Sequence, residues 1–158
     1  MYVKARAVSM QDTKDLTGNV ASTAMMEGWH DGEPQARWRV GFPLLSLEDS
    51  LVIQIETEPG ACLGTHTDGA EEILLVLAGR IEAHVDHERI ELGPGEMVVV
   101  PELAPHGFRT VGDVMARVLG FFPTKSVESV FDREIVPLGE TKVSVPPPRE
   151  ALEELGLV

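Results

Sequence analysis

Short runs of β-branched and aromatic residues, separated by glycine, proline and aspartate, recur from Ala36 to Val136. Such runs predict β-strands, because branched and aromatic side chains pack well on a pleated surface and the separating residues favour turns. No convincing amphipathic helix lies among them, so the pattern favours an all-β sandwich or barrel. The predicted strands are Arg37–Phe42, Ser50–Thr57, Glu71–Ala78, Arg80–Asp86, Arg89–Leu92, Met97–Pro101, Gly107–Val111, Val114–Phe121 and Val127–Val136.

The segments that flank these strands have a different composition. Residues 1–35 are polar, small or rich in turn formers, and we expect an extended N-terminal arm, with one short helix or strand at most, packed on a barrel of residues 36–136. Residues 137–158 are predicted to form a C-terminal tail in which three consecutive prolines precede a short helix. Leu152 and Leu155, three residues apart, would dock that helix by one edge.

Composition and charge limit the partners of the chain. Its 158 residues suit a single domain, and its formal charge of −13 argues against a nucleic-acid backbone or an anionic membrane as partner. A small neutral or cationic ligand fits better. The single cysteine, Cys62, excludes an intrachain disulfide. Since no apolar run approaches the ~20 residues that span a bilayer and the N-terminus does not resemble a signal peptide, we expect a cytoplasmic protein.

Two predicted strands are apolar on both faces. Glu72 to Leu77 and Met97 to Val100 show this pattern, whereas Arg80 to Asp86 alternates between apolar and polar residues. One face of an antiparallel sheet usually meets solvent, so apolarity on both faces indicates that the outer face is covered as well. A second sheet, the N-terminal arm or a second subunit could cover it, and we predict a homodimer.

Histidines and carboxylates gather at the ends of two of these strands. His66 and Asp68 are two residues apart, so on a strand both point to the same face. Asp68-Gly69 is a turn signal, after which Glu72 opens the next strand and can point back toward the pair. His106 lies at the end of a different strand. Two imidazoles with one or two carboxylates would make a divalent-metal site with open coordination positions.

The spacing of these residues resembles the two sequence motifs of the cupins. The resemblance is specific over residues 60–110 and looser over residues 36–122, and it implies a small jelly-roll barrel, or double-stranded β-helix, with a metal inside. The two motifs read Gly60-(five)-His66-x-Asp68-(three)-Glu72-(six)-Gly79 and Gly95-(five)-Pro101-(four)-His106.

Carried over onto this chain, the resemblance assigns three of the four metal-ligand positions of the family to His66, Glu72 and His106. The fourth position is usually a second histidine, and here it is Asp68. Elsewhere, Leu103 stands where glycine is common. Thr110 stands where asparagine is common, and these two departures are expected to have mild consequences.

Asp68 leaves three alternatives open. As a ligand it would give a His–Asp–Glu–His set, harder and more anionic than usual, that favours Fe(II) or Mn(II). As a turn residue facing solvent it would leave a triad of His66, Glu72 and His106. In the third alternative the site has lost its metal.

The remaining polar residues are expected to be structural. His84 and His87 are assigned to solvated surface. His30, which stands among glycine, aspartate and proline, is assigned to a loop, with the alternative that an arm closing the barrel brings it close to the site. Glu71 is expected to face outward. Cys62 is expected to act as a small buried apolar residue.

The resemblance implies one divalent transition metal per chain, with Fe or Mn favoured and Zn, Ni or Co as alternatives. The predicted function is a metal-dependent enzyme that carries out a dioxygenase-like oxidation of a small organic molecule. Two other functions stay open at this point: a non-redox isomerase or lyase that uses the metal as a Lewis acid, and a binding or sensing module without turnover.

Overall fold

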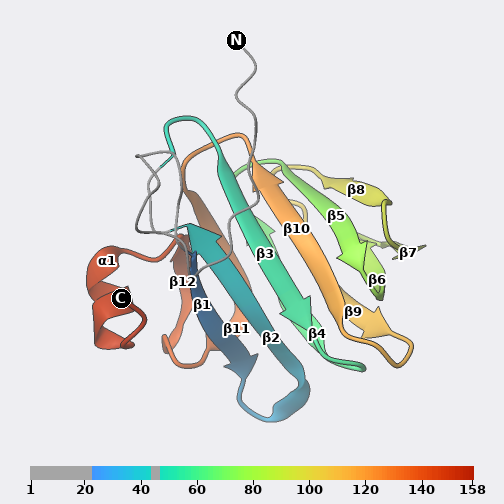
Figure 1. The fold of residues 1–158 in the computed structure, drawn as a ribbon, viewed down its shortest axis with the longest axis horizontal. Helices are drawn as coiled ribbons and strands as arrows, with labels where there is room; N and C mark the ends of the chain where they lie inside the picture. The colour runs from blue at the N-terminus through green and yellow to red at the C-terminus, as the bar shows by residue number, and fades with distance from the viewer. Residues whose placement is uncertain (1–22, 44–46) are drawn as a thin grey trace, which may run out of the picture.

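The computed structural model describes residues 23–43 and 47–158, so the predicted arm over residues 1–22 lies outside the described residues. The described chain is almost entirely β-structure, with one short helix near the C-terminus (Figure 1). In chain order the elements are β1 (Thr23–His30), β2 (Glu33–Pro43), β3 (Leu51–Thr57), β4 (Cys62–Asp68), β5 (Glu72–Ala78), β6 (Arg80–Val85), β7 (Glu88–Leu92), β8 (Met97–Val100), β9 (His106–Val111), β10 (Ala116–Phe122), β11 (Val127–Ile135), β12 (Glu140–Val145) and α1 (Arg149–Glu154).

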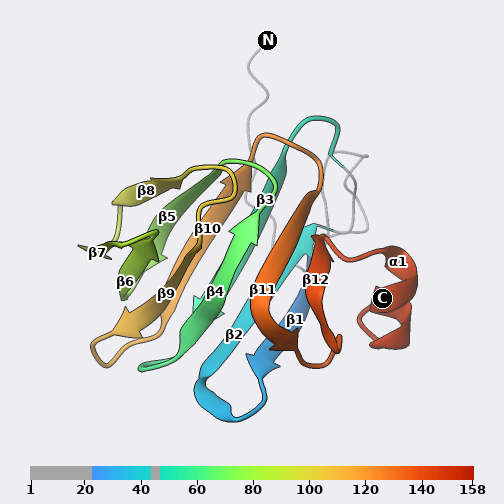
Figure 2. The same cartoon turned by 180° about the vertical axis from the view of Figure 1, so that it is seen from behind.

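The strands form two layers that face each other. One layer has the order β1-β2-β3-β10-β5-β8 and lies at the front of Figure 1, and the other has the order β12-β11-β4-β9-β6-β7 and lies at the front of Figure 2. The layers join where β2 runs parallel to β4, at Ala36 and Cys62. A bridge between Trp29 and Val136 links them again. This arrangement confirms the predicted all-β jelly-roll barrel.

Every strand predicted from the sequence is present, with ends that shift by a few residues. Strands β6 and β7 form a hairpin with a two-residue turn at Asp86-His87, because Val85 pairs with Glu88. Three further strands were not predicted: β1, β4 and β12. Of these, β1 lies in the segment assigned to the arm and pairs along its length with β2.

The core fills the space between the two layers. Its largest fully buried apolar side chains come from both layers, and each contributes about 1.5–3 kcal/mol of burial free energy. They are Phe42, Phe108, Phe122, Leu51, Leu74 and Ile81.

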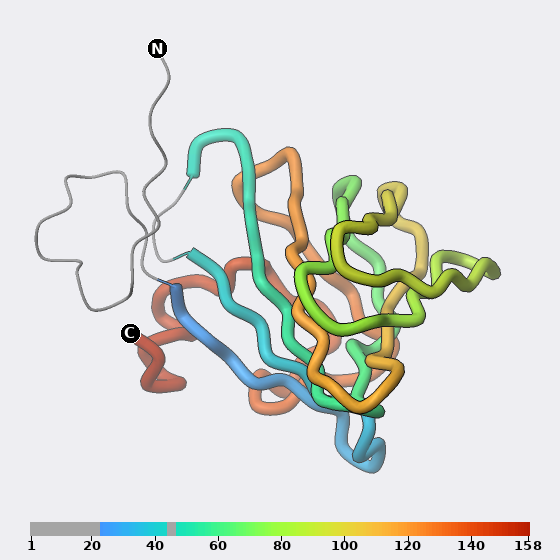
Figure 3. Tube along the Cα trace, turned by 45° about the vertical axis from the view of Figure 1, so that its right-hand side comes forward, coloured from blue at the N-terminus to red at the C-terminus, as the bar shows by residue number. Residues whose placement is uncertain are grey.

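The predicted C-terminal helix is confirmed as α1, which follows Pro148 and buries Leu152. Gly156 ends it with a positive φ of 69°, a conformation that glycine adopts readily. The helix lies at the end of the barrel opposite β7 and β8 (Figure 3). Among the described residues, no helix is long and apolar enough to cross a membrane.

Leu103 and Thr110 depart from the family pattern outside the four candidate ligand positions, and their structural surroundings differ. Leu103 has a φ of 62°, in the left-handed region where a side chain costs about 1–2 kcal/mol. Its backbone N–H donates to the carbonyl oxygen of Asp68 at 2.9 Å, so this turn supports the end of β4. Thr110 is buried and donates from its hydroxyl to the carbonyl oxygen of Thr57 at 2.9 Å.

Candidate metal centre

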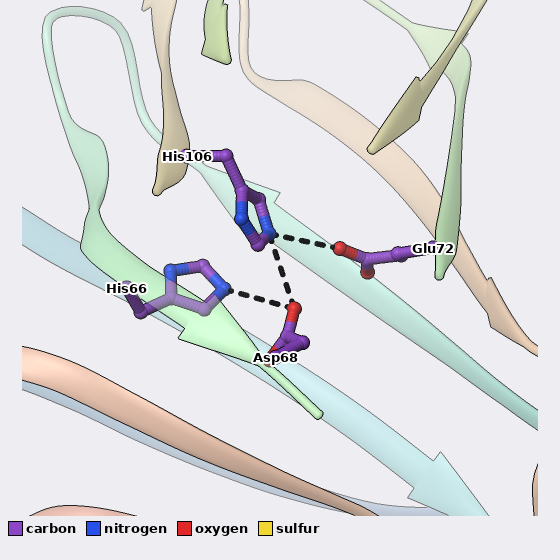
Figure 4. A group of neighbouring side chains, drawn as sticks. All are labelled: His66, Asp68, Glu72 and His106. Atoms are coloured by element: carbon purple, nitrogen blue, oxygen red, sulfur yellow. Dashed lines mark hydrogen bonds and ion pairs between the residues drawn. The ribbon is translucent and has the colours of Figure 1, made fainter. Parts of the chain in front are cut away.

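The structure brings together all four residues that the sequence singled out (Figure 4). Strand β4 carries His66 and Asp68 on its inner face, and pairing of β4 with β9 sets His106 opposite His66. Glu72 reaches the group from the start of β5 in the other layer. All four side chains are buried, and one ligand atom from each lies within 4.8 Å of the others.

Backbone carbonyl groups fix the protonation of both imidazoles. Nδ1 of His66 lies 2.8 Å from the carbonyl oxygen of Gly64, and Nδ1 of His106 lies 2.8 Å from that of Ala104. A carbonyl oxygen can only accept, so Nδ1 carries the proton in each ring. When such a ring is neutral, the lone pair of Nε2 therefore points toward the other members of the cluster, the arrangement found in metal-binding histidines.

The carboxylate of Asp68 points into the cluster. One oxygen, Oδ1, accepts a hydrogen bond from the hydroxyl of Ser129 at 2.5 Å. The other, Oδ2, lies 3.5 Å from Nε2 of His66 and 3.1 Å from Nε2 of His106, yet it is buried without a hydrogen-bond partner. Since Asp68 is only 2% exposed, the alternative of a turn residue facing solvent is wrong.

The cluster attracts positive charge strongly. Burial, the largest influence on His106, lowers its pKa, but the contacts of its Nε2 with the negatively charged carboxylates of Asp68 and Glu72 outweigh burial and raise the pKa to about 10. Burial also acts to raise the pKa of Asp68, but the close approach of its Oδ2 to Nε2 of His106 and of His66 holds this pKa well below its usual range. Burial raises the pKa of Glu72, whose Oε2 lies 3.1 Å from Nε2 of His106. Two buried carboxylates thus need a cation, either a proton on His106 or a metal ion.

Neighbouring residues that the sequence did not single out support the ligand side chains. Gly120 on β10 makes room for Glu72, because a Cβ at this position would lie 2.6 Å from Oε1 of Glu72. The ring of Phe131 on β11 stacks on His66, with centroids 4.5 Å apart. Trp38 on β2 stacks on the other side of Phe131 at 5.6 Å. The stacked rings of Phe131 and Trp38 therefore hold the plane of His66.

The prediction that His30 lies in a loop is wrong. His30 ends β1, is buried, and donates from Nδ1 to the carbonyl oxygen of Glu134 at 2.9 Å. Its ring meets Trp38 edge-on at 5.2 Å. It also covers Gly64 of β4, where a Cβ would lie 2.1 Å from Nε2 of His30. His30 thus packs on the strand that carries His66 and Asp68.

Other residues considered from the sequence lie outside the cluster. His84 is half-buried and hydrogen-bonded to Thr65 at 3.1 Å, so its assignment to solvated surface is only partly right. His87 and Glu71 are exposed, as predicted. Cys62 is partly buried, and burial raises the pKa of its thiol, which disfavours the reactive thiolate.

A cavity of about 60 Å³ adjoins the cluster. Apart from the cluster residues His66, Asp68 and Glu72, its lining is mainly apolar. The lining residues come from strands of both layers and from the segment before α1. The apolar and aromatic lining residues are Met26, Trp38, Val40, Phe42, Ile53, Ile55, Leu63, Phe122, Phe131, Ile135, Leu138, Val143, Val145 and Pro147. A small molecule in this cavity would lie beside His66, Asp68 and Glu72.

Comparison with solved structures shows the same fold in proteins of different activity. A variant of oxalate decarboxylase from Bacillus subtilis is 17% identical with a TM-score of 0.56, and the match covers 66% of this chain and 30% of that one. Peruvianin-I, a cysteine peptidase from Thevetia peruviana latex, is 16% identical with a TM-score of 0.56, over 66% of this chain and 72% of that one. The chain thus spans less than a third of the oxalate decarboxylase chain, and at these identities the likeness shows the fold alone.

Sequence comparison identifies the family. No curated protein matches the chain. The family model described as a cupin domain matches residues 54–122, a segment that contains all four clustered residues. This match identifies residues 54–122, the middle of the jelly-roll barrel, as a cupin domain.

Proposed function

We propose that the chain binds one divalent transition metal through His66, Asp68, Glu72 and His106 and acts on a small organic molecule in the adjoining cavity. The observation that carries the proposal is the convergence of two Nε2 lone pairs and two buried carboxylates on one point, with Oδ2 of Asp68 lacking a hydrogen-bond partner. Imidazole nitrogen and carboxylate oxygen suit Fe(II) or Mn(II), and the same donors accept Zn, Ni or Co.

The proposed reaction is a dioxygenase-like oxidation, for which a bound Fe or Mn ion would supply redox chemistry and open coordination positions. The residues of the chain would hold the metal-binding side chains in position. Gly64 and Ala104 fix the imidazole tautomers through their carbonyl oxygens, and Ser129 orients the carboxylate of Asp68. The apolar wall of the cavity would exclude water from the substrate.

Metal analysis followed by an oxygen-uptake assay tests this function. We expect one Fe or Mn ion per purified chain, and oxygen consumption when phenolic, thiol and keto-acid compounds are screened with metal-loaded protein. A chain that retains no metal and takes up none would refute the proposal. Product formed without oxygen consumption would favour the isomerase or lyase alternative, and ligand binding without turnover the binding or sensing alternative.

We also propose that the chain forms a homodimer through the outer face of the layer β3-β10-β5-β8. Strand pairing places two rows of mainly apolar side chains on this face. Contiguous apolar surface of this kind marks an interface, and a second copy offers the same face in return. The rows are Val52-Phe121-Ile73-Val99 and Gln54-Leu119-Leu75-Met97.

The cytoplasmic location stays a prediction.

Replacing Val99 by lysine is expected to weaken the dimer at least ~10-fold, because a charge would have to be buried without a partner. Ile90→Lys is the matched control, since Ile90 and Val99 are both 50% exposed and Ile90 lies on β7 of the other layer. Sedimentation velocity over a range of concentrations measures the change. A monomeric wild type, or a Val99→Lys variant that dimerises like the wild type, would contradict the proposed interface.

A further inference from the structure

We propose that the cavity selects a short, uncharged and mainly apolar ligand that reaches the metal through a single oxygen atom. The inference rests on the metal site proposed above and adds the chemical class of its ligand. Three observations carry it: the charge of the cluster, the lack of polar partners in the cavity wall, and the size of the cavity.

Charge is the first observation. Asp68 and Glu72 bring two negative charges, and the two imidazoles are neutral when Nε2 binds a metal. A divalent ion therefore makes the centre neutral overall. An uncharged ligand keeps this balance, whereas an anionic ligand would leave one net negative charge buried without a partner. A histidine in place of Asp68 would make the loaded centre more positive by one charge, so this aspartate shifts the site away from anions.

The cavity wall offers no compensating cation. Among its described lining residues there is neither lysine nor arginine. Arg109 and Arg117 could have met a carboxylate substrate had they faced inward. Instead they lie outside the barrel, where Arg109 pairs with Glu82 at 3.1 Å and Arg117 pairs with Glu56 at 3.2 Å. A ligand carboxylate thus finds no positive side chain in the wall.

Hydrogen-bond partners for a second polar group are also scarce. Outside the cluster, the polar side chains of the described lining are Ser129 and Ser144. The hydroxyl of Ser129 donates to Asp68, and that of Ser144 donates to the carbonyl oxygen of Pro146 at 3.2 Å. Both donors are in use, so a further acceptor group on the ligand, such as a carbonyl or carboxylate oxygen, would lose its water without a side-chain donor to replace it. The wall favours a ligand whose remaining atoms are carbon.

The size of the cavity limits the length of the ligand. The cavity measures about 60 Å³. Since a single water already needs at least ~10–15 Å³, the cavity holds at most roughly six heavy atoms. Each methylene that enters such a wall should improve affinity about fourfold, and the gain should end once the cavity is filled.

Titration of Mn(II)-loaded protein with two homologous series tests the inference. The probes are the 1-alkanols from propanol to heptanol and the alkanoates of equal length, and isothermal titration calorimetry measures their affinity after metal content has been determined. We expect alkanol affinity to rise about fourfold per methylene up to roughly six heavy atoms and then to level off. Each alkanoate should bind at least ~10-fold more weakly than the matching alkanol.

Two variants sharpen the charge argument. Asp68→His is expected to shift the ratio of alkanoate to alkanol affinity toward alkanoates by at least ~10-fold. Glu71→Gln removes the exposed carboxylate next to Glu72 and should leave this ratio unchanged. If Asp68→His fails to fold or to take up Mn(II), the alkanol and alkanoate titrations of the wild type are sufficient to test the inference.

The outcomes separate the ligand class from the proposed function. If the wild type takes up no metal, the proposed function fails and the ligand inference fails with it. If the protein takes up metal but binds alkanoates as tightly as alkanols, or binds all chain lengths equally, the metal site stands and the ligand inference is overturned.

Discussion

The variant His106→Ala is expected to bind Mn(II) or Fe(II) at least ~100-fold more weakly than the wild type. Loss of a supporting residue already weakens metal sites by about 10–100-fold, and His106 would be a direct ligand. Its removal also leaves Asp68 and Glu72 without the imidazole that contacts both at 3.1 Å. Metal affinity is measured by competition with a chelating dye, and far-ultraviolet circular dichroism checks that the β-sheets persist.

The same loss should appear in thermal unfolding. A metal present at 100 times its dissociation constant stabilises the folded chain by about 2.7 kcal/mol, which corresponds to a rise of roughly 5–10 °C in Tm at this length. We expect this rise in the wild type and in the control His87→Ala, whose histidine is exposed at the tip of the β6–β7 hairpin. His106→Ala should show almost none of it. An equal rise in all three proteins would mean that the ligand assignment is wrong.

The sequence predicted the fold well where strands bury apolar residues. The sequence pattern did not predict strands β1 and β4, because the inner faces of these strands are not apolar throughout. Strand β4 turns Gly64, His66 and Asp68 inward, so its alternation is one of small and polar residues. Strand β1 turns Gly28 and His30 inward beside two apolar residues. In both strands a glycine lies where another side chain covers it, which hides the apolar pattern that marks a strand.

The clustering of the four candidate ligands was predictable because their spacing follows the chain. His66, Asp68 and Glu72 come from one strand and the start of the next, and His106 joins them through the pairing of β4 with β9. The supporting residues follow no such spacing. Ser129 and Phe131 reach the site because β11 pairs with the other edge of β4, which sets Ser129 opposite Asp68 and Phe131 opposite His66. That register depends on long-range pairing, which a sequence pattern does not encode.

Packing of His30 on Gly64 makes the N-terminal hairpin part of the site, and the variant Gly64→Ala tests this packing. A Cβ at Gly64 would lie 2.1 Å from Nε2 and 2.8 Å from Cδ2 of His30. The ring cannot easily move away, because it is hydrogen-bonded to Glu134 and meets both Trp38 and Phe131 edge-on. We expect the variant to lose about 1–3 kcal/mol of unfolding free energy. Urea denaturation of the metal-free protein measures this loss.

The control for Gly64→Ala lies on the same segment. A Cβ at Gly69 would meet only the carbonyl oxygen of Glu128, at an ordinary 3.6 Å, so Gly69→Ala should change stability little. We further expect the double variant His30→Ala/Gly64→Ala to be more stable than the sum of the two single changes predicts, by at least ~1 kcal/mol, since the new methyl group then occupies the space of the lost ring. Additive changes would show that His30 does not pack on β4. A coupled pair would instead mean that β1, which lies outside the matched cupin domain, helps to hold the strand that carries His66 and Asp68.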